Sequence, residues 1–206
     1  MLRVDHALIG AVDLERAARD LLEEHGLASV EGGRHMGLGT ANRIVPLGAG
    51  YVELIAVVDP EEAMTNPFGS WIQERVSVGE GPIGVCLATD DIERESKRLD
   101  LEPLAMSRTR PDGTELRWRL AGLAEAISRG LPFFIQWDIA PELHPGRTPA
   151  SHRVAVEGIA WVELAGDEGT IRSWVGEPLR EIRITDGAPA VRSIAIRADG
   201  REIVLR

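Results

Sequence analysis

The chain has 206 residues and a formal net charge of -10, with 44% hydrophobic and 27% charged residues. This composition is typical of a soluble globular protein and excludes a disordered or membrane-embedded chain. A negative field repels phosphate backbones and anionic lipids, so neither nucleic acid nor a membrane is an expected partner. Charged Asp5 and Asp13 interrupt the apolar start, where no signal peptide is therefore expected, and we expect a cytoplasmic protein.

The first elements follow the order strand, helix, strand, strand. A strand is expected at Arg3–Val12, and Asp13 is a good N-cap for the helical pattern that follows it and ends at Gly26. A glycine-rich loop, EGGRHMGLG, then leads into an extended stretch at Thr40–Leu47 and a strand at Tyr51–Val58.

The same order begins again after a segment rich in turn formers. The motif Asp-Leu-Glu-Arg at residues 13–16 recurs as Asp-Ile-Glu-Arg at 91–94, which sets an offset of 78 residues. Around this helix we expect a strand at Ile83–Thr89, two paired stretches about a Pro-Asp-Gly turn at 111–113, and a strand at 131–138. The sequence therefore contains an internal repeat.

The C-terminal part of the sequence is expected to form a third, shorter module that is rich in strands. It comprises a strand at Glu157–Ala165, a brief helix near Thr170–Val175, and strands near 179–185, 191–197 and 201–206. The pattern predicts an α+β protein of tandem βαβββ modules, whose curved mixed sheets surround a cleft. We divide the chain into a first module (1–58), a linker (59–80), a second module (81–138), a loop (139–152) and a β-rich C-terminal module (153–206).

His6 and Glu53 are the leading candidates for chemistry. In the predicted strands, Val4, His6 and Leu8 share one face while Asp5 lies on the other, and Glu53 sits among apolar neighbours. A buried carboxylate normally requires a cation, hydrogen-bond donors or a metal. An imidazole and a carboxylate together suit Zn, Fe, Mn or Ni, or acid–base catalysis.

A structural role for the same two residues stays open. A lone histidine on a strand is often a hydrogen-bonded core or edge residue. Glu53 could instead pair with Arg43 or Arg34 from the preceding segment.

Candidate pocket residues lie around the glycine-rich loop and the aromatic strands. His35, Thr40 and Asn42 are predicted to contact a ligand, because the glycines permit its close approach, although a solvated hairpin loop explains them equally well. Trp118 and Trp137 are predicted to form an apolar wall, against the alternative that they belong to the core.

Several chemistries are disfavoured. The loop lacks the GxxxxGK[ST] order and a following helix, so no nucleotide cofactor is expected. No GxSxG elbow occurs, and Cys86 lies in the apolar run IGVCLA, which disfavours nucleophilic catalysis. His144 and His152 flank a Pro/Gly loop and are expected to be exposed.

The sequence resembles the glyoxalase-like domains of the vicinal oxygen chelate superfamily, which includes glyoxalases, bleomycin resistance proteins and extradiol dioxygenases. The resemblance covers residues 3–138 and lies in the stretches DHALIGAVDLERAARDL, GGRHMGLGTANRIVPLG, YVELIAV and LPFFIQWD. It implies βαβββ modules paired around a metal cleft, with ligands from the first and last strands of each module.

On that pattern, the first module supplies His6 and Glu53 as metal ligands and catalytic residues. The offset of 78 places Gly84 at the position of His6 in the second module, and Gln136 is assigned to the position of Glu53. The resemblance therefore implies one divalent metal (Zn, Ni, Mn or Fe) held by at most three side chains, His6, Glu53 and Gln136.

Two functions follow from these observations. The first is a metal-dependent lyase, isomerase or dioxygenase that takes a small organic molecule into the cleft. The alternative is a metal-free protein that binds or sequesters such a molecule, which Gly84 and the neutral Gln136 favour. The resemblance also implies a homodimer.

Overall fold

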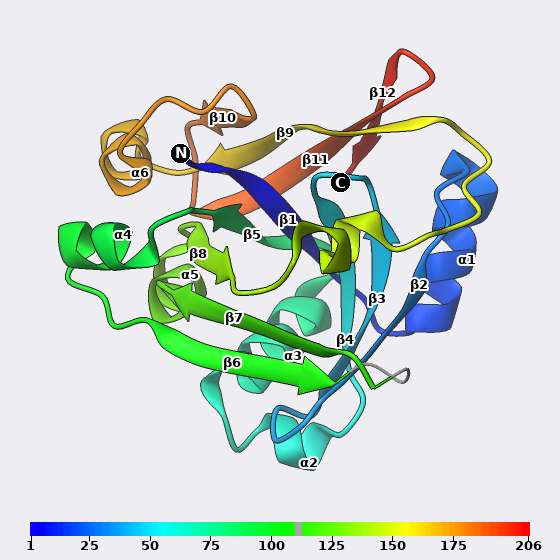
Figure 1. Cartoon of the computed structure of the whole chain (residues 1–206), viewed down its shortest axis with the longest axis horizontal. Coiled ribbons are helices and arrows are strands. Elements are labelled where there is room, and N and C mark those ends of the chain that lie inside the picture. The colour runs from blue at the N-terminus through cyan, green and yellow to red at the C-terminus, as the bar shows by residue number, and fades with distance from the viewer. Residues whose placement is uncertain (110–112) are drawn as a thin grey trace.

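Two β-sheets organise the part of the chain that the structure describes. The computed structural model describes residues 1–109 and 113–206, and Figure 1 shows it in full. The larger sheet has eight strands in the order β2-β3-β4-β1-β5-β8-β7-β6, and the smaller has four in the order β10-β9-β11-β12. The expected glyoxalase-like α+β fold is confirmed.

The first module has the predicted βαβββ order. It comprises β1 (Arg3–Gly10), α1 (Leu14–His25), β2 (Val30–His35), β3 (Thr40–Pro46) and β4 (Tyr51–Val57). The caps of α1 are those expected, since Asp13 accepts a hydrogen bond from the Arg16 amide and Gly26 is left-handed with φ 73°. The predicted glycine-rich loop is wrong in its first half, which forms β2.

The segment between the modules is largely helical. It contains α2 (Pro60–Ala63) and α3 (Pro67–Val78). Asp59 and Asn66 each accept a hydrogen bond from a backbone amide three residues ahead, and a proline begins each helix. The Asp-Pro and Asn-Pro pairs, which read as turn formers, are thus helix starts.

The second module repeats the first with one added helix. It comprises β5 (Gly81–Ala88), α4 (Ile92–Leu99), β6 (Leu104–Thr109), β7 (Glu115–Ala121), α5 (Leu123–Arg129) and β8 (Phe133–Trp137). The sequence analysis missed α5. Of the turn expected at 111–113, only Gly113 lies within the described residues.

The rest of the chain forms two short turns and the smaller sheet. The turns are η1 (Pro141–Leu143) and η2 (Pro145–Arg147), which we call together the 141–147 segment. The sheet comprises β9 (Val156–Ala165), β10 (Ile182–Thr185), β11 (Ala190–Ala198) and β12 (Arg201–Leu205), with α6 (Glu168–Val175) between β9 and β10.

The two modules meet where β1 pairs antiparallel with β5. One face of the large sheet packs against the small sheet in a continuous core, for example Val85 and Leu87 with Ile194 and Ile196. On the other face, α3 and α5 pack against the strands, as Trp71 does against Leu8 and Phe133. No helix in the described residues has the length and apolar character needed to cross a bilayer.

The turn between β2 and β3 offers a matched test of this packing. Gly39 (φ +67°) lies against α2, and a Cβ added there would stand 2.3 Å from the Ala63 amide nitrogen. Gly37 (φ +76°) has open space around the same position. We expect Gly37→Ala to lower the free energy of unfolding by about 1–2 kcal/mol through backbone strain alone. Gly39→Ala should cost about 1–3 kcal/mol more because of overpacking.

Urea unfolding of both variants measures the difference between their free energies of unfolding. Equal losses of stability would contradict the close packing of α2 on this turn.

Candidate functional site

A cavity of ≈ 200 Å³ lies on the face of the large sheet that carries α3 and α5. Its walls are mostly apolar, and its polar groups come from β1, β2, β3, β4 and β6. The polar residues of its lining include His6, His35, Asn42, Tyr51, Glu53 and Arg108. The single chain supplies both modules that bound this cavity.

A β-bulge in β1 places Asp5 and His6 together. The register of β1 on β5 shifts between Val4 and His6, so Asp5 is an extra residue in the ladder. Its carboxylate Oδ1 lies 2.7 Å from His6 Nδ1, and both residues are buried. The prediction that Asp5 and His6 lie on opposite faces is wrong, because a bulge interrupts the strict alternation of a strand.

Asp5 is fully buried and has three nitrogen partners. Besides His6 Nδ1, its Oδ2 accepts from Trp137 Nε1 at 3.1 Å and contacts His144 Nε2 at 3.0 Å. Burial alone would raise the pKa of Asp5, but hydrogen bonds from His144 and His6 outweigh it and hold the pKa below the usual 3.8. Asp5 is therefore an ionised acceptor.

Glu53 stands between two imidazoles. Its Oε2 lies 3.7 Å from His6 Nε2 and its Oε1 3.8 Å from His35 Nε2, whereas Asn42 Nδ2 donates to Oε1 at 2.5 Å. The alternative partners do not reach it. Arg43 bonds to Glu15 and Ser29 instead, and Arg34 to Asp59 and Glu62.

The separation of His6 from Glu53 decides what this site can do. At 3.7 Å, the two atoms are too far apart for a hydrogen bond. Because His6 Nδ1 donates to the ionised Asp5, neutral His6 has a bare acceptor at Nε2. An imidazole acceptor and a carboxylate thus face the same cavity, and both call for a donor from a ligand.

Only some of the predicted pocket residues line the cavity. His35 and Asn42 line the cavity, while the fully buried Thr40 contacts His35 Nδ1 through its hydroxyl at 2.9 Å. Burial lowers the pKa of His35, and the charge of Arg108 lowers it further against the opposing pull of Glu53. Trp118 lines the cavity, and Trp137 packs against it at a ring separation of 5.5 Å.

Gln136 does not reach the site. Its Oε1 accepts a hydrogen bond from the Ile92 amide at 2.8 Å and so caps the start of α4. Strand register explains the error. Leu8 pairs with Glu53 in the first module, and Cys86, the equivalent of Leu8, pairs with Phe133 in the second. Phe133, not Gln136, therefore occupies the position of Glu53.

Two histidines that were expected to be exposed are structural partners. His144 is 7% exposed and contacts Asp5. His152 Nδ1 accepts from the Ala28 amide at 3.1 Å, and its Nε2 lies 2.9 Å from the Pro46 carbonyl. Both lie in an irregular segment, where hydropathy patterns carry no information on burial. The sequence analysis also missed Tyr51, whose ring stacks on His6 at 4.4 Å.

The predicted metal does not fit these residues. His6 and His35 approach different oxygens of Glu53, and Gly84 and Phe133 replace any ligands from the second module. Within the described residues, no group of three or more His, Cys, Asp or Glu could hold a metal ion. Three protein ligands are the usual minimum for a catalytic zinc site.

Burial keeps Tyr51, which lines the cavity, and the nearby buried Cys86 protonated. It raises the pKa of Tyr51 and that of the Cys86 thiol well above their ordinary values, with the charges of Asp5 and Glu53 acting in the same direction. A buried thiol in this state is not a nucleophile.

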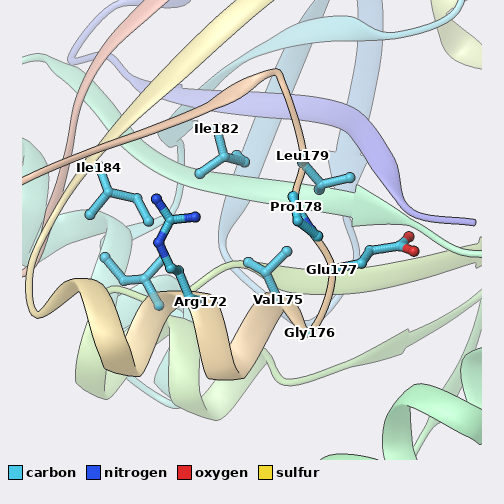
Figure 2. A pocket seen from close by; sticks show the side chains of 9 residues that line it. Arg172, Val175, Gly176, Glu177, Pro178, Leu179, Ile182 and Ile184 are labelled. Atoms are coloured by element: carbon cyan, nitrogen blue, oxygen red, sulfur yellow. The ribbon is translucent and has the colours of Figure 1, made fainter.

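A second cavity of ≈ 170 Å³ lies between α6 and β10 (Figure 2). Aliphatic side chains such as Ile182 and Leu179 dominate its lining. Its charged groups serve the fold, since Arg172 bonds to Glu168 and Glu177 accepts from the Leu2 amide. We assign no chemistry to this cavity.

Comparison with known proteins agrees with the architecture. A family model described as a glyoxalase-like domain matches residues 4–177. The chain belongs to the glyoxalase-like domain family. No curated protein matches the sequence.

A solved structure of similar length shares the fold of this glyoxalase-like protein. A hypothetical protein from Staphylococcus aureus is similar over 99% of this chain and 98% of its own, with a TM-score of 0.71 and 18% identity. A methylmalonyl-CoA epimerase from Mycobacterium tuberculosis is similar over 68% of this chain and 89% of its own, with a TM-score of 0.48 and 18% identity. At such identities only the fold is shown.

The state of Asp5 predicts a pH-dependent stability. Its folded pKa lies below the unfolded 3.8, so its ionisation stabilises the fold fully above that pH, and this stabilisation is lost as the pH falls further. Asp5→Asn should therefore lower the free energy of unfolding at neutral pH by about 1–3 kcal/mol. The difference in free energy of unfolding between this variant and the wild type should become smaller below pH 3.8.

Urea unfolding over a pH series measures this difference, with Asp186→Asn at an exposed position as the control. A difference that stays constant with pH would show that the Asp5 carboxylate is not the stabilising species.

The donor set predicts weak metal binding. After incubation with Zn, Ni, Mn or Fe and dialysis, the untagged protein should hold no more metal than the His6→Ala/Glu53→Gln double variant, because the described side chains around His6 and Glu53 are not arranged as a set of three metal ligands. Elemental analysis of the wild type and the double variant measures the metal that each retains. Near-stoichiometric metal that the double variant loses would restore the metal-dependent interpretation.

Proposed function

We propose that this glyoxalase-like protein is an enzyme that binds a small, largely apolar organic molecule and moves a proton on it. The single observation that carries the proposal is the pair of His6 Nε2 and Glu53 Oε2, which stand 3.7 Å apart and face the cavity. A histidine and a glutamate that served packing alone would satisfy each other by a direct hydrogen bond.

The cavity supports a substrate with an apolar body and an oxygen-bearing end. Leu8, Ile44 and Phe133 line its walls beside the polar groups. The substrate's oxygen-bearing end meets His6, Glu53 and Asn42, and its body packs against the aliphatic and aromatic side chains. Burying the body there excludes water from the acid–base pair.

Each residue has a distinct role in this proposal. Asp5 orients the His6 ring, and His6 Nε2 takes a proton from a substrate carbon next to a carbonyl group. Glu53, oriented by Asn42, accepts a hydrogen bond from a substrate hydroxyl and so aligns it. This chemistry belongs to isomerases and lyases.

A second candidate function is binding without chemistry. The second module contributes no counterpart to the polar pair, since Gly84 and Phe133 occupy the equivalent positions. A protein that only sequesters an apolar molecule would need no more than the walls of this cavity.

Hydrogen–deuterium exchange distinguishes the two functions. Hydroxyacetone, acetoin, 2-hydroxyacetophenone and phenylacetone each carry exchangeable C–H groups beside a carbonyl. In D₂O, the wild type should accelerate loss of these proton signals, and His6→Asn should lower the rate by about 10²–10⁴-fold through loss of the base. Glu53→Gln should lower the exchange rate of the hydroxyketones more than that of phenylacetone.

His25→Asn, which makes the same change outside the cavity, is the matched control. Saturation-transfer NMR on the same four compounds reports binding. Compounds that bind while their exchange stays at the protein-free rate would contradict the enzyme and support the binding protein.

A further inference from the structure

The 141–147 segment, which lies outside both modules, is fixed to the site by its backbone. The Gly48 amide donates to the Gly146 carbonyl at 2.7 Å, and a Cβ on Gly146 would stand 2.3 Å from the Gly50 carbonyl oxygen. Only glycine permits this approach. The same segment contributes Pro145 to the wall of the cavity, so it borders the ligand space directly.

The backbone of this segment sets the tautomer of His144. The Gly146 amide donates to His144 Nδ1 at 3.1 Å, so Nδ1 is an acceptor and the neutral ring carries its proton on Nε2. That nitrogen lies 3.0 Å from Asp5 Oδ2 and therefore donates to it. The Tyr51 and Trp137 rings pack against the imidazole in edge-to-face arrangements.

The donors to Asp5 are divided between its two oxygens. His144 Nε2 and Trp137 Nε1 both donate to Oδ2. Oδ1 is the oxygen that meets His6 Nδ1, at 2.7 Å. The carboxylate is thus rotated into one orientation, in which the remaining oxygen can only accept from His6.

We infer that His144 is a positioning residue, which fixes His6 in its Nδ1–H tautomer by orienting Asp5 from outside the two modules. The catalytic consequence rests on the proposed function, because only the Nδ1–H tautomer has an acceptor at Nε2, the nitrogen that faces Glu53. The positioning itself is a property of the free protein. At metal sites, the partners that orient a ligating histidine change activity by about 10–100-fold when they are lost, and we expect a loss of the same order here.

A matched pair of variants separates positioning from packing. Glutamine places an amide N–H where His144 has Nε2–H, whereas methionine has a similar length and no donor. In full-length protein with ¹⁵N-labelled histidine, long-range ¹H–¹⁵N correlation spectra report which nitrogen of His6 carries the proton. The His6→Asn variant assigns that signal among the five histidines.

We expect His6 to be Nδ1-protonated in the wild type and in His144→Gln, and to show a mixture of tautomers in His144→Met. Exchange of the carbonyl compounds should fall by about 10–100-fold in His144→Met and return to within a few-fold of wild type in His144→Gln. If the methionine variant unfolds, His144→Asn, whose shorter side chain stops short of Asp5, provides the same comparison with glutamine.

A purely structural His144 would lower stability and leave the His6 tautomer unchanged in His144→Met, and this result would overturn the inference. A tautomer that shifts as expected in a protein without exchange activity would support the positioning role and contradict only the proposed function.

Discussion

The site depends on one buried carboxylate. Asp5 has no exposed surface, and an unpaired charge in such a place costs several kcal/mol. Its partners offset this cost, and they come from three parts of the chain: His6 in β1, Trp137 in β8, and His144 in the 141–147 segment. The same contacts that stabilise the charge therefore bring the first module, the second module and the segment after them to a single point. The orientation of His6 follows from that convergence.

The two modules carry different side chains around this point. Pairing of β1 with β5 relates them, and it places Gly84 and Phe133 where the first module has His6 and Glu53. His6 and Glu53 consequently have no polar counterparts in the second module, and Phe133 gives the cavity an apolar wall beside His6, with the two rings 5.8 Å apart. In the proposed function, this cavity would take a ligand with one polar end. This difference between the modules also explains why the two copies of the repeat do not supply a symmetric set of metal-binding side chains.

Local signals allowed much of the fold to be predicted, and the site only in part. The caps Asp13 and Asp91 mark α1 and α4, and their spacing revealed the repeat and the place of Gly84. At β8 the offset of 78 points to Leu131, whereas strand register places Phe133 at the position of Glu53, so the assignment of Gln136 is three residues too late. Asp5 was missed because a bulge breaks strand alternation. His144 was missed because tertiary contacts alone bury an irregular segment.

Neutron diffraction from crystals of the protein tests the central claim most directly, because it locates the hydrogen atoms of the buried network. The account predicts a deprotonated Asp5 carboxylate, with hydrogen on His6 Nδ1 and on His144 Nε2, and with Nε2 as the bare nitrogen of the neutral His6 ring. A hydrogen on Asp5, or a His6 ring that carries its proton on the nitrogen facing Glu53, would contradict it.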